Sequence, residues 1–179
     1  MKKTLNNEFF SRNASLVAKE ILGKIIARKI GKKILKAKIV ETEAYFDEND
    51  PASRAVQKGD IRETMLMDPG TILVYGVHNN WLLNIVTNKK GKAEAILIRA
   101  LEPLNFKEKT NGPGLLTKAL NIDKKFHKKN ILSSKEIWLE KNEIDGNFEI
   151  VESFRIGVKK DLNLKLRYFI KNNKFVSKK

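Results

Sequence analysis

The chain has 179 residues, 41% of them hydrophobic and 32% charged, which is typical of a globular protein. Its 36 Lys and Arg residues outnumber 21 Asp and Glu residues, and the net charge of +15 favours phosphate-rich partners, nucleic acid before an anionic membrane. Cys is absent and His occurs twice, which excludes disulfides, a Cys nucleophile, iron–sulfur clusters, thiolate zinc sites and His-rich metal centres.

Neither a membrane span nor a signal peptide is predicted. No apolar run approaches the ~20 residues that a span needs, and the first ten residues lack the apolar core of a secretory signal. We therefore expect an intracellular protein, in the cytoplasm or at the nucleoid, without a membrane partner.

The first predicted elements are a helix and a hairpin. Residues 13–23 have helical periodicity, with Asn13 or Ser15 as the N-terminal cap and Gly23 at the end. The segments KIIARKI and KILKAKIV flank a Gly-Lys pair and predict a β-hairpin.

The second strand of this hairpin continues into ETEAYF. Alternation along a strand then predicts that Ile39, Glu41, Glu43 and Tyr45 point the same way. The polar residues 47–64 that follow are nearly free of large apolar side chains and predict a long loop, and long loops in compact domains are often functional.

The rest of the chain predicts short strands with one further helix. In chain order these are a turn at 68–70, strands at 71–75 and 81–86, a buried strand at 93–103, a helix at 112–121, and strands at 136–140, 148–157 and 164–170. This pattern favours an α+β antiparallel fold over alternating βαβ units. Without a repeat or linker, we expect one domain over residues 1–179.

Two segments concentrate the positive charge. Residues 124–129 hold four Lys, and residues 159–179 hold eight Lys or Arg and one acid. One interpretation is a solvated Lys-rich surface, because 29 of the 36 cations are Lys. The other is sequence-independent binding of nucleic acid, to which Lys contributes point-charge contacts with phosphate.

Several polar residues lie in apolar surroundings. Glu41 and Glu43 either pair with lysines across the sheet or include a desolvated catalytic base. Arg99 is either a structural ion-pair partner or a pocket cation beside a carboxylate. Asn84 is either a satisfied core amide or a reader of a buried ligand, and the glycines at 112–114 precede a helix and could offer N–H groups to a phosphate.

An ordered set of motifs covers nearly the whole chain, from EFF at 8–10 to FVS at 175–177. Between them lie KIVETEAY at 38–45, DPAS at 50–53, PGT at 69–71, LIRALEP at 97–103, GPG at 112–114, TKAL at 117–120 and RIGV at 155–158. Together they resemble the alkyladenine (3-methyladenine) DNA glycosylase family of base-excision repair. The resemblance implies a single mixed α/β domain with a curved antiparallel sheet, from which a hairpin inserts into the DNA minor groove.

The resemblance also implies an activity and a set of site residues. The family enzymes are monofunctional, need no metal or cofactor, flip a damaged purine out of the duplex and hydrolyse its N-glycosidic bond. Glu43 matches the glutamate that activates water and stabilises the oxocarbenium-like sugar. Arg99 matches the arginine that helps to hold this glutamate and the water. Tyr45 and Tyr75 match the aromatics that sandwich the extruded base, and Asn84 matches the asparagine on the pocket floor that rejects undamaged guanine.

This sequence departs from the family pattern in three places. Arg54 stands where a histidine usually follows DPAS, at a position that helps to read the base. The hairpin Tyr75–Asn84 is one residue shorter and lacks the wedge tyrosine, which leaves Val77 or His78 as the DNA-intercalating residue. Residues 58–64 keep little of the usual loop. Glu41 retains a structural interpretation.

We therefore expect a monomeric glycosylase acting on double-stranded DNA that contains damaged purines. Its expected products are 3-methyladenine and 7-methylguanine, with hypoxanthine and ethenoadenine as further candidates, and an abasic site in an uncut backbone, since the pattern places no Schiff-base lysine. Two other interpretations are a non-catalytic nucleic-acid-binding protein on the same scaffold and a basic RNA-associated factor.

Overall fold

The computed structural model describes residues 5–142 and 147–178 of the protein. The strands are β1 (Ile25–Ile30), β2 (Lys33–Tyr45), β3 (Ile72–Val77), β4 (Asn80–Val86), β5 (Ala95–Pro103), β6 (Ile137–Glu140), β7 (Ile150–Ser153) and β8 (Arg167–Ile170). The helices are α1 (Asn7–Phe10), α2 (Ala14–Glu20), α3 (Asp60–Met65) and α4 (Pro113–Ala119), with 3-10 turns at Arg54–Val56 and Lys124–Phe126.

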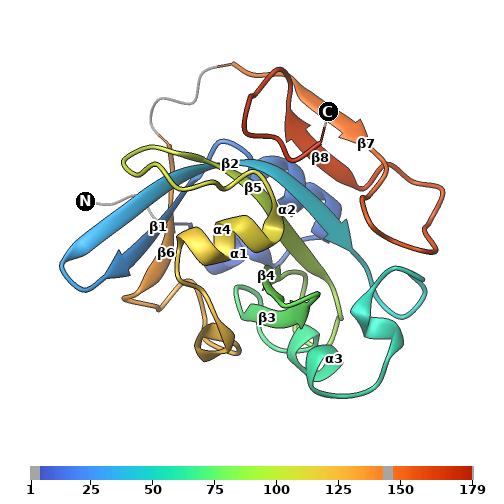
Figure 1. Cartoon of the computed structure of the whole chain (residues 1–179). Helices are drawn as coiled ribbons and strands as arrows, with labels where there is room; N and C mark the ends of the chain where they lie inside the picture. Colours follow the sequence, from blue (N-terminus) through green and yellow to red (C-terminus); the bar gives the residue numbers. More distant parts are fainter. Residues whose placement is uncertain (1–4, 143–146, 179) are drawn as a thin grey trace.

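These strands form one antiparallel sheet within the described residues. Its order is β3-β4-β5-β2-β1-β6, with β8 paired to β2 and β7 paired to β8. Along one edge of β2, residues 33–38 pair with β1 and residues 41–43 pair with β8, so the sheet divides there and curls (Figure 1). The α+β class with a curved antiparallel sheet is thereby confirmed.

Helices pack on the sheet and complete its core. α2 contacts β2 and β5, whereas α4 contacts β4 and β5; Figure 1 shows α4 in front of the sheet and α2 behind it. The predicted helix at 13–23 is α2: Asn13 caps it by accepting a hydrogen bond from the N–H of Ser15 at 2.9 Å. Gly23 follows it with a φ of 83°, a left-handed conformation that favours glycine.

β2 deviates from simple alternation at Val40. The register between β2 and β5 shifts between Ile39 and Glu41, and again between Glu41 and Thr42, which is the signature of β-bulges. Ile39 and Val40 consequently both lie in the main core. The simple alternation that was predicted from Ile39 to the glutamates is thus interrupted, because a bulge adds a residue to β2 between them.

Two segments differ from the sequence prediction. Residues 47–64, expected to be loop throughout, contain a 3-10 turn and most of α3. α3 forms because Thr64 and Met65 are buried and because Asp60 is bound by His127 and Lys128. The strand expected at 148–157 ends at Ser153, and the following Arg155 binds the carboxylates of Asp50 and Asp161, which lie outside the sheet.

β3 and β4 form a hairpin with a two-residue turn. His78 and Asn79 have φ values of 46° and 60°, as a type I′ turn requires, and asparagine tolerates this region well. Val77 pairs with Asn80 at the end of the ladder. His78 therefore lies at the exposed tip, whereas Val77 belongs to the strand.

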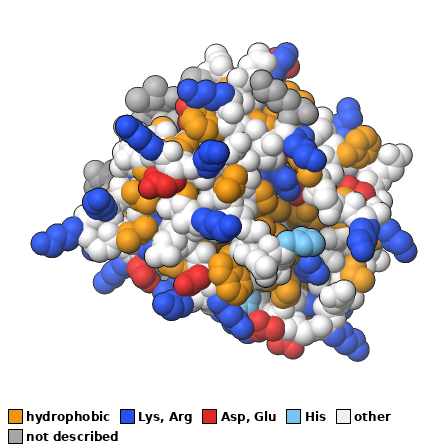
Figure 2. Space-filling view, in the orientation of Figure 1, with side chains coloured by type: hydrophobic (Ala, Val, Ile, Leu, Met, Phe, Trp, Pro, Cys, Tyr) orange, Lys and Arg blue, Asp and Glu red, His pale blue; other side chains and the backbone are white. Residues whose placement is uncertain are grey.

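The face of the molecule seen in Figure 2 carries positive charge without one dominant cluster. Lys and Arg side chains are spread over the face seen in Figure 2, among fewer acidic groups. None of the helices in the described part of the chain has both the length and the apolar character that a membrane span requires.

Candidate active site

Glu43 on β2 is fully buried and held by two hydrogen bonds and an ion pair. Its Oε1 accepts from the N–H of Ile156 at 2.8 Å and lies 3.2 Å from Nη1 of Arg99. Its Oε2 accepts from the hydroxyl of Tyr45 at 2.7 Å. Burial raises the pKa of Glu43, and the charge of Arg99 is the main opposing effect.

The carboxylate of Glu43 keeps an unused acceptor position. A carboxylate offers about four lone-pair sites in all. Among the described residues, the carboxylate of Glu43 accepts one hydrogen bond from Ile156 on Oε1 and one from Tyr45 on Oε2, and its Oε1 forms an ion pair with Arg99. Burial, and after it the charge of Glu43, raises the pKa of Tyr45 well above its usual value. The hydroxyl of Tyr45 therefore stays protonated and acts as a donor. One further donor, such as a water molecule, can therefore bind Oε2.

Arg99 on β5 joins Glu43 to a second buried carboxylate. Its Nε donates to Oε1 of Glu41 at 3.0 Å, and Glu41 is as fully buried as Glu43. Glu41 also accepts from Nε of Arg167 on β8 at 2.8 Å. Glu41 is thus ion-paired as the structural interpretation expected, but with two arginines and not with the surface lysines.

The predicted base-contacting residues surround one small pocket. Its lining consists of Tyr45, Arg54, Met65, Leu73, Tyr75, Asn84 and Ala95. The cavity volume is about 10 Å³, which is room for about one water molecule and not for a purine. The guanidinium carbon of Arg54 lies 5.3 Å from the centroid of the Tyr75 ring and covers part of it.

Asn84 occupies a position compatible with both earlier interpretations. Its Nδ2 donates to the carbonyl oxygen of Leu73 at 3.3 Å in a buried environment, so the amide is partly satisfied by the sheet. It also lines the pocket beside Tyr75. Besides the carbonyl oxygen of Leu73, the Asn84 side chain interacts with the hydroxyl of Tyr75, and this interaction acts to lower the pKa of Tyr75.

Glu43 itself lies behind the pocket. It is not among the lining residues, and the link between them is the hydroxyl of Tyr45, whose ring lines the pocket. On the ring of Tyr45 lies the guanidinium of Arg155, 4.6 Å from the centroid. The carboxylate and the pocket are thus adjacent but separated by one side chain.

Arg155 and Asp50 are site residues that the sequence reasoning missed. Their side chains are fully buried and form two hydrogen bonds of 2.7 Å, a bidentate pair. Arg155 also donates to the carbonyl oxygen of Ala44 at 2.9 Å, which places the following N–H, that of Ile156, on Glu43. Asp50 belongs to the motif DPAS and Arg155 to the motif RIGV. The presence of an acid in one motif and an arginine in another was the sequence signal that could have suggested this pair.

The hairpin tip and the Gly-Pro-Gly segment lie elsewhere. Neither Val77 nor His78 is among the lining residues of the pocket. A Cβ atom at Gly114 would lie 2.7 Å from side-chain atoms of Asn80, so α4 approaches the hairpin closely only because this residue is glycine. The glycine thus has a packing role beside the hairpin.

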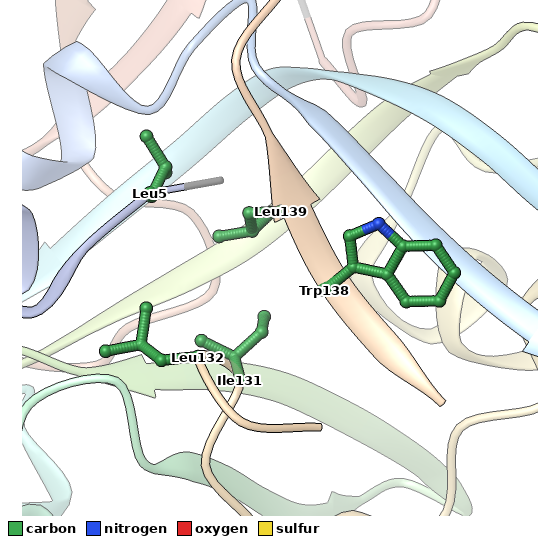
Figure 3. A pocket seen from close by; sticks show the side chains of 5 residues that line it. All are labelled: Leu5, Ile131, Leu132, Trp138 and Leu139. Atoms are coloured by element: carbon green, nitrogen blue, oxygen red, sulfur yellow. The ribbon is translucent and has the colours of Figure 1, made fainter. Parts of the chain in front are cut away.

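A second pocket of about 10 Å³ lies near β6 and carries no reactive group. Figure 3 shows Leu5, Ile131, Leu132 and Leu139 converging on it, while the ring of Trp138 points away. Because its lining lacks any charged side chain, we interpret it as a gap in apolar packing.

Together, a basic surface, a buried carboxylate–arginine pair and an adjacent tyrosine-lined pocket define a candidate enzyme site. The Methylpurine-DNA glycosylase (MPG) family matches residues 8–174. The chain belongs to this family, and it is a DNA glycosylase of base-excision repair.

Individual relatives support this assignment, and the chain matches each of them over nearly its full length. A protein of Aeropyrum pernix named "Putative 3-methyladenine DNA glycosylase" is 40% identical over 185 residues, covering 99% of this chain and 95% of the relative. Proteins of the same name from Clostridium perfringens strain 13 and Legionella pneumophila strain Corby are 39% and 37% identical, and each comparison covers 98% of this chain and 99% of the relative.

Proposed function

We propose that this glycosylase releases alkylated purines, 3-methyladenine and 7-methylguanine foremost, from double-stranded DNA, with Glu43 as the base that activates water. The observation that carries the proposal is the geometry of Glu43: a fully buried carboxylate, fixed by two hydrogen bonds and an ion pair, whose Oε2 accepts only the hydrogen bond of Tyr45 among the described residues. A carboxylate fixed in this way needs little reorganisation when charge develops beside it.

In the proposed reaction, water binds Oε2 of Glu43 and attacks the sugar carbon C1′. The water oxygen forms the new bond to C1′, one water proton passes to Glu43, and the base departs with the electrons of the broken N-glycosidic bond. An alkylated purine that is cationic in DNA leaves as a neutral base. The negative charge of Glu43 stabilises the positive charge that the sugar carries in between.

The pocket would hold the flipped base between the rings of Tyr45 and Tyr75, above Asn84. Stacking of a cationic purine on an aromatic face contributes about 0.5–2 kcal/mol. Because the pocket has a volume of only about 10 Å³, Arg54 must leave the ring of Tyr75 before a purine enters. The side chain of Arg54 is exposed, so this movement does not disturb the core.

Base flipping also needs a group that fills the gap left in the duplex. We propose His78 for this role, because it lies at the exposed tip of the hairpin, whereas Val77 is paired in β3. The flat imidazole can lie between neighbouring base pairs in the minor groove.

The decisive experiment compares the wild type with Glu43→Gln in the release of free base from methylated duplex DNA, in buffer with a chelator. We expect release by the wild type, a loss of at least about 100-fold in Glu43→Gln, and retained binding of damaged DNA. Glu63→Gln, an exposed glutamate on α3, is the matched control. Full activity of Glu43→Gln contradicts the proposal, and binding without release by the wild type favours a non-catalytic protein.

The pH dependence tests the same residue. A general base acts when deprotonated, so the rate should fall as the pH drops through the pKa of Glu43, which burial raises. We expect the acidic limb of the single-turnover rate to lie above the pH at which an exposed glutamate titrates. A rate that is constant from pH 7 down to about pH 4 would rule out Glu43 as the base.

A further inference from the structure

Glu41 forms a junction between four segments of the chain, although it touches neither the pocket nor Oε2 of Glu43. Its Oε1 accepts from Nε of Arg99 at 3.0 Å, from Nε of Arg167 at 2.8 Å and from Oγ of Ser177 at 2.8 Å. Its Oε2 accepts from the N–H of Ser177 at 2.6 Å. A surface ion pair does not acquire this many donors, and Glu41 has no exposed area.

We propose that Glu41 and Ser177 are positioning residues that set the guanidinium of Arg99 against Glu43. This inference rests on the proposed function of Glu43. It adds the residues that orient the guanidinium of Arg99 toward Glu43. It assigns to the segment after β8 a direct influence on the rate of base release.

The planarity of guanidinium makes such control effective. Once Nε of Arg99 is bound to Glu41, the plane of the group is fixed, and so is the direction of Nη1 toward Glu43. Oγ of Ser177 lies 3.5 Å from the remaining nitrogen, Nη2. All three nitrogens of Arg99 therefore have a partner, and rotation away from Glu43 would break contacts on the other two.

Charge alternation supports the same conclusion. Glu43, Arg99, Glu41 and Arg167 follow one another as minus, plus, minus and plus, each at 3.2 Å or less from the next. Buried charges are tolerated when each is paired. Without Glu41, Glu43 would be the one acidic partner of Arg99 among the described residues. Arg99 would then neutralise Glu43 more strongly and would lose the contact that orients it.

Several charged or titratable groups act on Glu43 and must enter any pH argument. They are Glu41 and Tyr45 on β2, Arg99 on β5, Tyr75 on β3, and Arg155 beside the ring of Tyr45. Among them Glu41 raises the pKa of Glu43 and Arg99 lowers it. Removing the charge of Glu41 should therefore lower the pKa of Glu43.

The test uses single-turnover base release by the whole protein at saturating enzyme, across pH, for three variants. Ser177→Ala removes the hydroxyl but no charge, so we expect a rate about 10-fold lower with an unchanged acidic limb. Glu41→Gln removes the charge, so we expect a larger loss and an acidic limb shifted to lower pH. Lys178→Ala is the matched control, because its exposed side chain takes no part in the junction whereas its backbone oxygen, which accepts from Arg167, is retained.

DNA binding should be equal in all folded variants, because the junction lies away from the pocket lining. The proposal is overturned if Ser177→Ala releases base as fast as Lys178→Ala. It is also overturned if Glu41→Gln is folded and the acidic limb of its pH–rate profile lies at the same pH as in the wild type. Should Glu41→Gln fail to fold, the comparison of Ser177→Ala with Lys178→Ala decides.

Failure of the proposed function gives a different result, namely no base release by the wild type. The junction is then tested by NMR of the Arg99 Nε–H group. In the wild type we expect a slowly exchanging signal, and in Ser177→Ala a signal that exchanges at least about 10-fold faster. Equal exchange in the two proteins overturns the positioning of Arg99.

Discussion

At the scale of single residues, Arg54 gives this pocket a character of its own. Its guanidinium lies over the ring of Tyr75 in the cavity where we propose that the base binds. Although Arg54 must leave the ring before a purine enters, its side chain starts at the pocket, so its positive charge stays near the bound base. That charge opposes a cationic purine. It favours a neutral purine, because the departing base gains electron density as the glycosidic bond breaks. Two unit charges about 4 Å apart interact by about 1 kcal/mol in a water-like environment.

Replacement of Arg54 by Gln should therefore change the preference among damaged bases. We expect the ratio of kcat/KM for cationic 7-methylguanine to that for neutral hypoxanthine to rise about five-fold, as about 1 kcal/mol implies. We compare the ratio of the two kcat/KM values because any change in pocket volume affects both substrates and largely cancels in the ratio. Arg62→Gln, on nearby α3, serves as the control; an unchanged ratio in Arg54→Gln would show that the charge does not reach the base.

At the scale of elements, the segment that follows β7 is attached to the site by Arg155. Its guanidinium binds Asp50 in a bidentate pair, the carbonyl oxygen of Ala44, and Asp161. Burial acts to raise the pKa of Asp50, but the hydrogen bonds and charge of Arg155 and the hydrogen bonds from the N–H groups of Phe46 and Ala52 together outweigh it and lower the pKa. A group with a depressed pKa stabilises the fold above its unfolded pKa, and this stabilisation is lost as the pH falls through the folded value.

Asp50→Asn should consequently destabilise the protein by about 3 kcal/mol at pH 7, because it leaves Arg155 buried with one fewer charged partner. The difference from the wild type should shrink below about pH 4, where Asp50 begins to be protonated in the unfolded chain. Urea unfolding at pH 7 and pH 3 measures both effects. Asp68→Asn, which alters an exposed pair with Lys90, should cost no more than about 0.5 kcal/mol. A constant difference at both pH values would contradict the assignment.

The same elements show how far sequence reasoning reaches. The hairpin around Gly31, the capped helix α2 and the strand that carries Glu43 were predictable, because each depends on local periodicity and turn chemistry. The bulge at Val40 was not, since it arises from pairing with β5. Nor was the bond from Ile156 to Glu43, which joins residues 113 positions apart. The roles of the site residues remain predictions, although the structure brings Glu43, Tyr45 and Arg99 together as the resemblance implied.

At the scale of the whole molecule, the net charge of +15 acts independently of the site. Positive side chains attract the phosphate backbone regardless of sequence or damage, and binding releases counterions from DNA. The spread of Lys and Arg over the face in Figure 2 agrees with such a diffuse attraction. In the function that we propose, recognition of damage depends instead on the pocket.

Salt should separate these two contributions. Between 50 and 200 mM NaCl we expect the affinity for undamaged duplex to fall about 10³-fold, as neutralisation of about six phosphates implies. The affinity for damaged duplex should fall in parallel, while the rate of base release at saturating protein stays constant because the groups around Glu43 are buried. Fluorescence anisotropy and single-turnover assays measure the two quantities. Salt-insensitive affinity would contradict a diffuse electrostatic contact.

The position of β2 has a consequence for how the enzyme fails. This strand carries Glu41, Glu43 and Tyr45 and is hydrogen-bonded to β1, β5 and β8. Its amides can exchange with solvent only when the centre of the sheet opens, which is among the rarest fluctuations of a folded protein. Heat should thus abolish base release at the same temperature at which the sheet melts, with no inactive folded form in between.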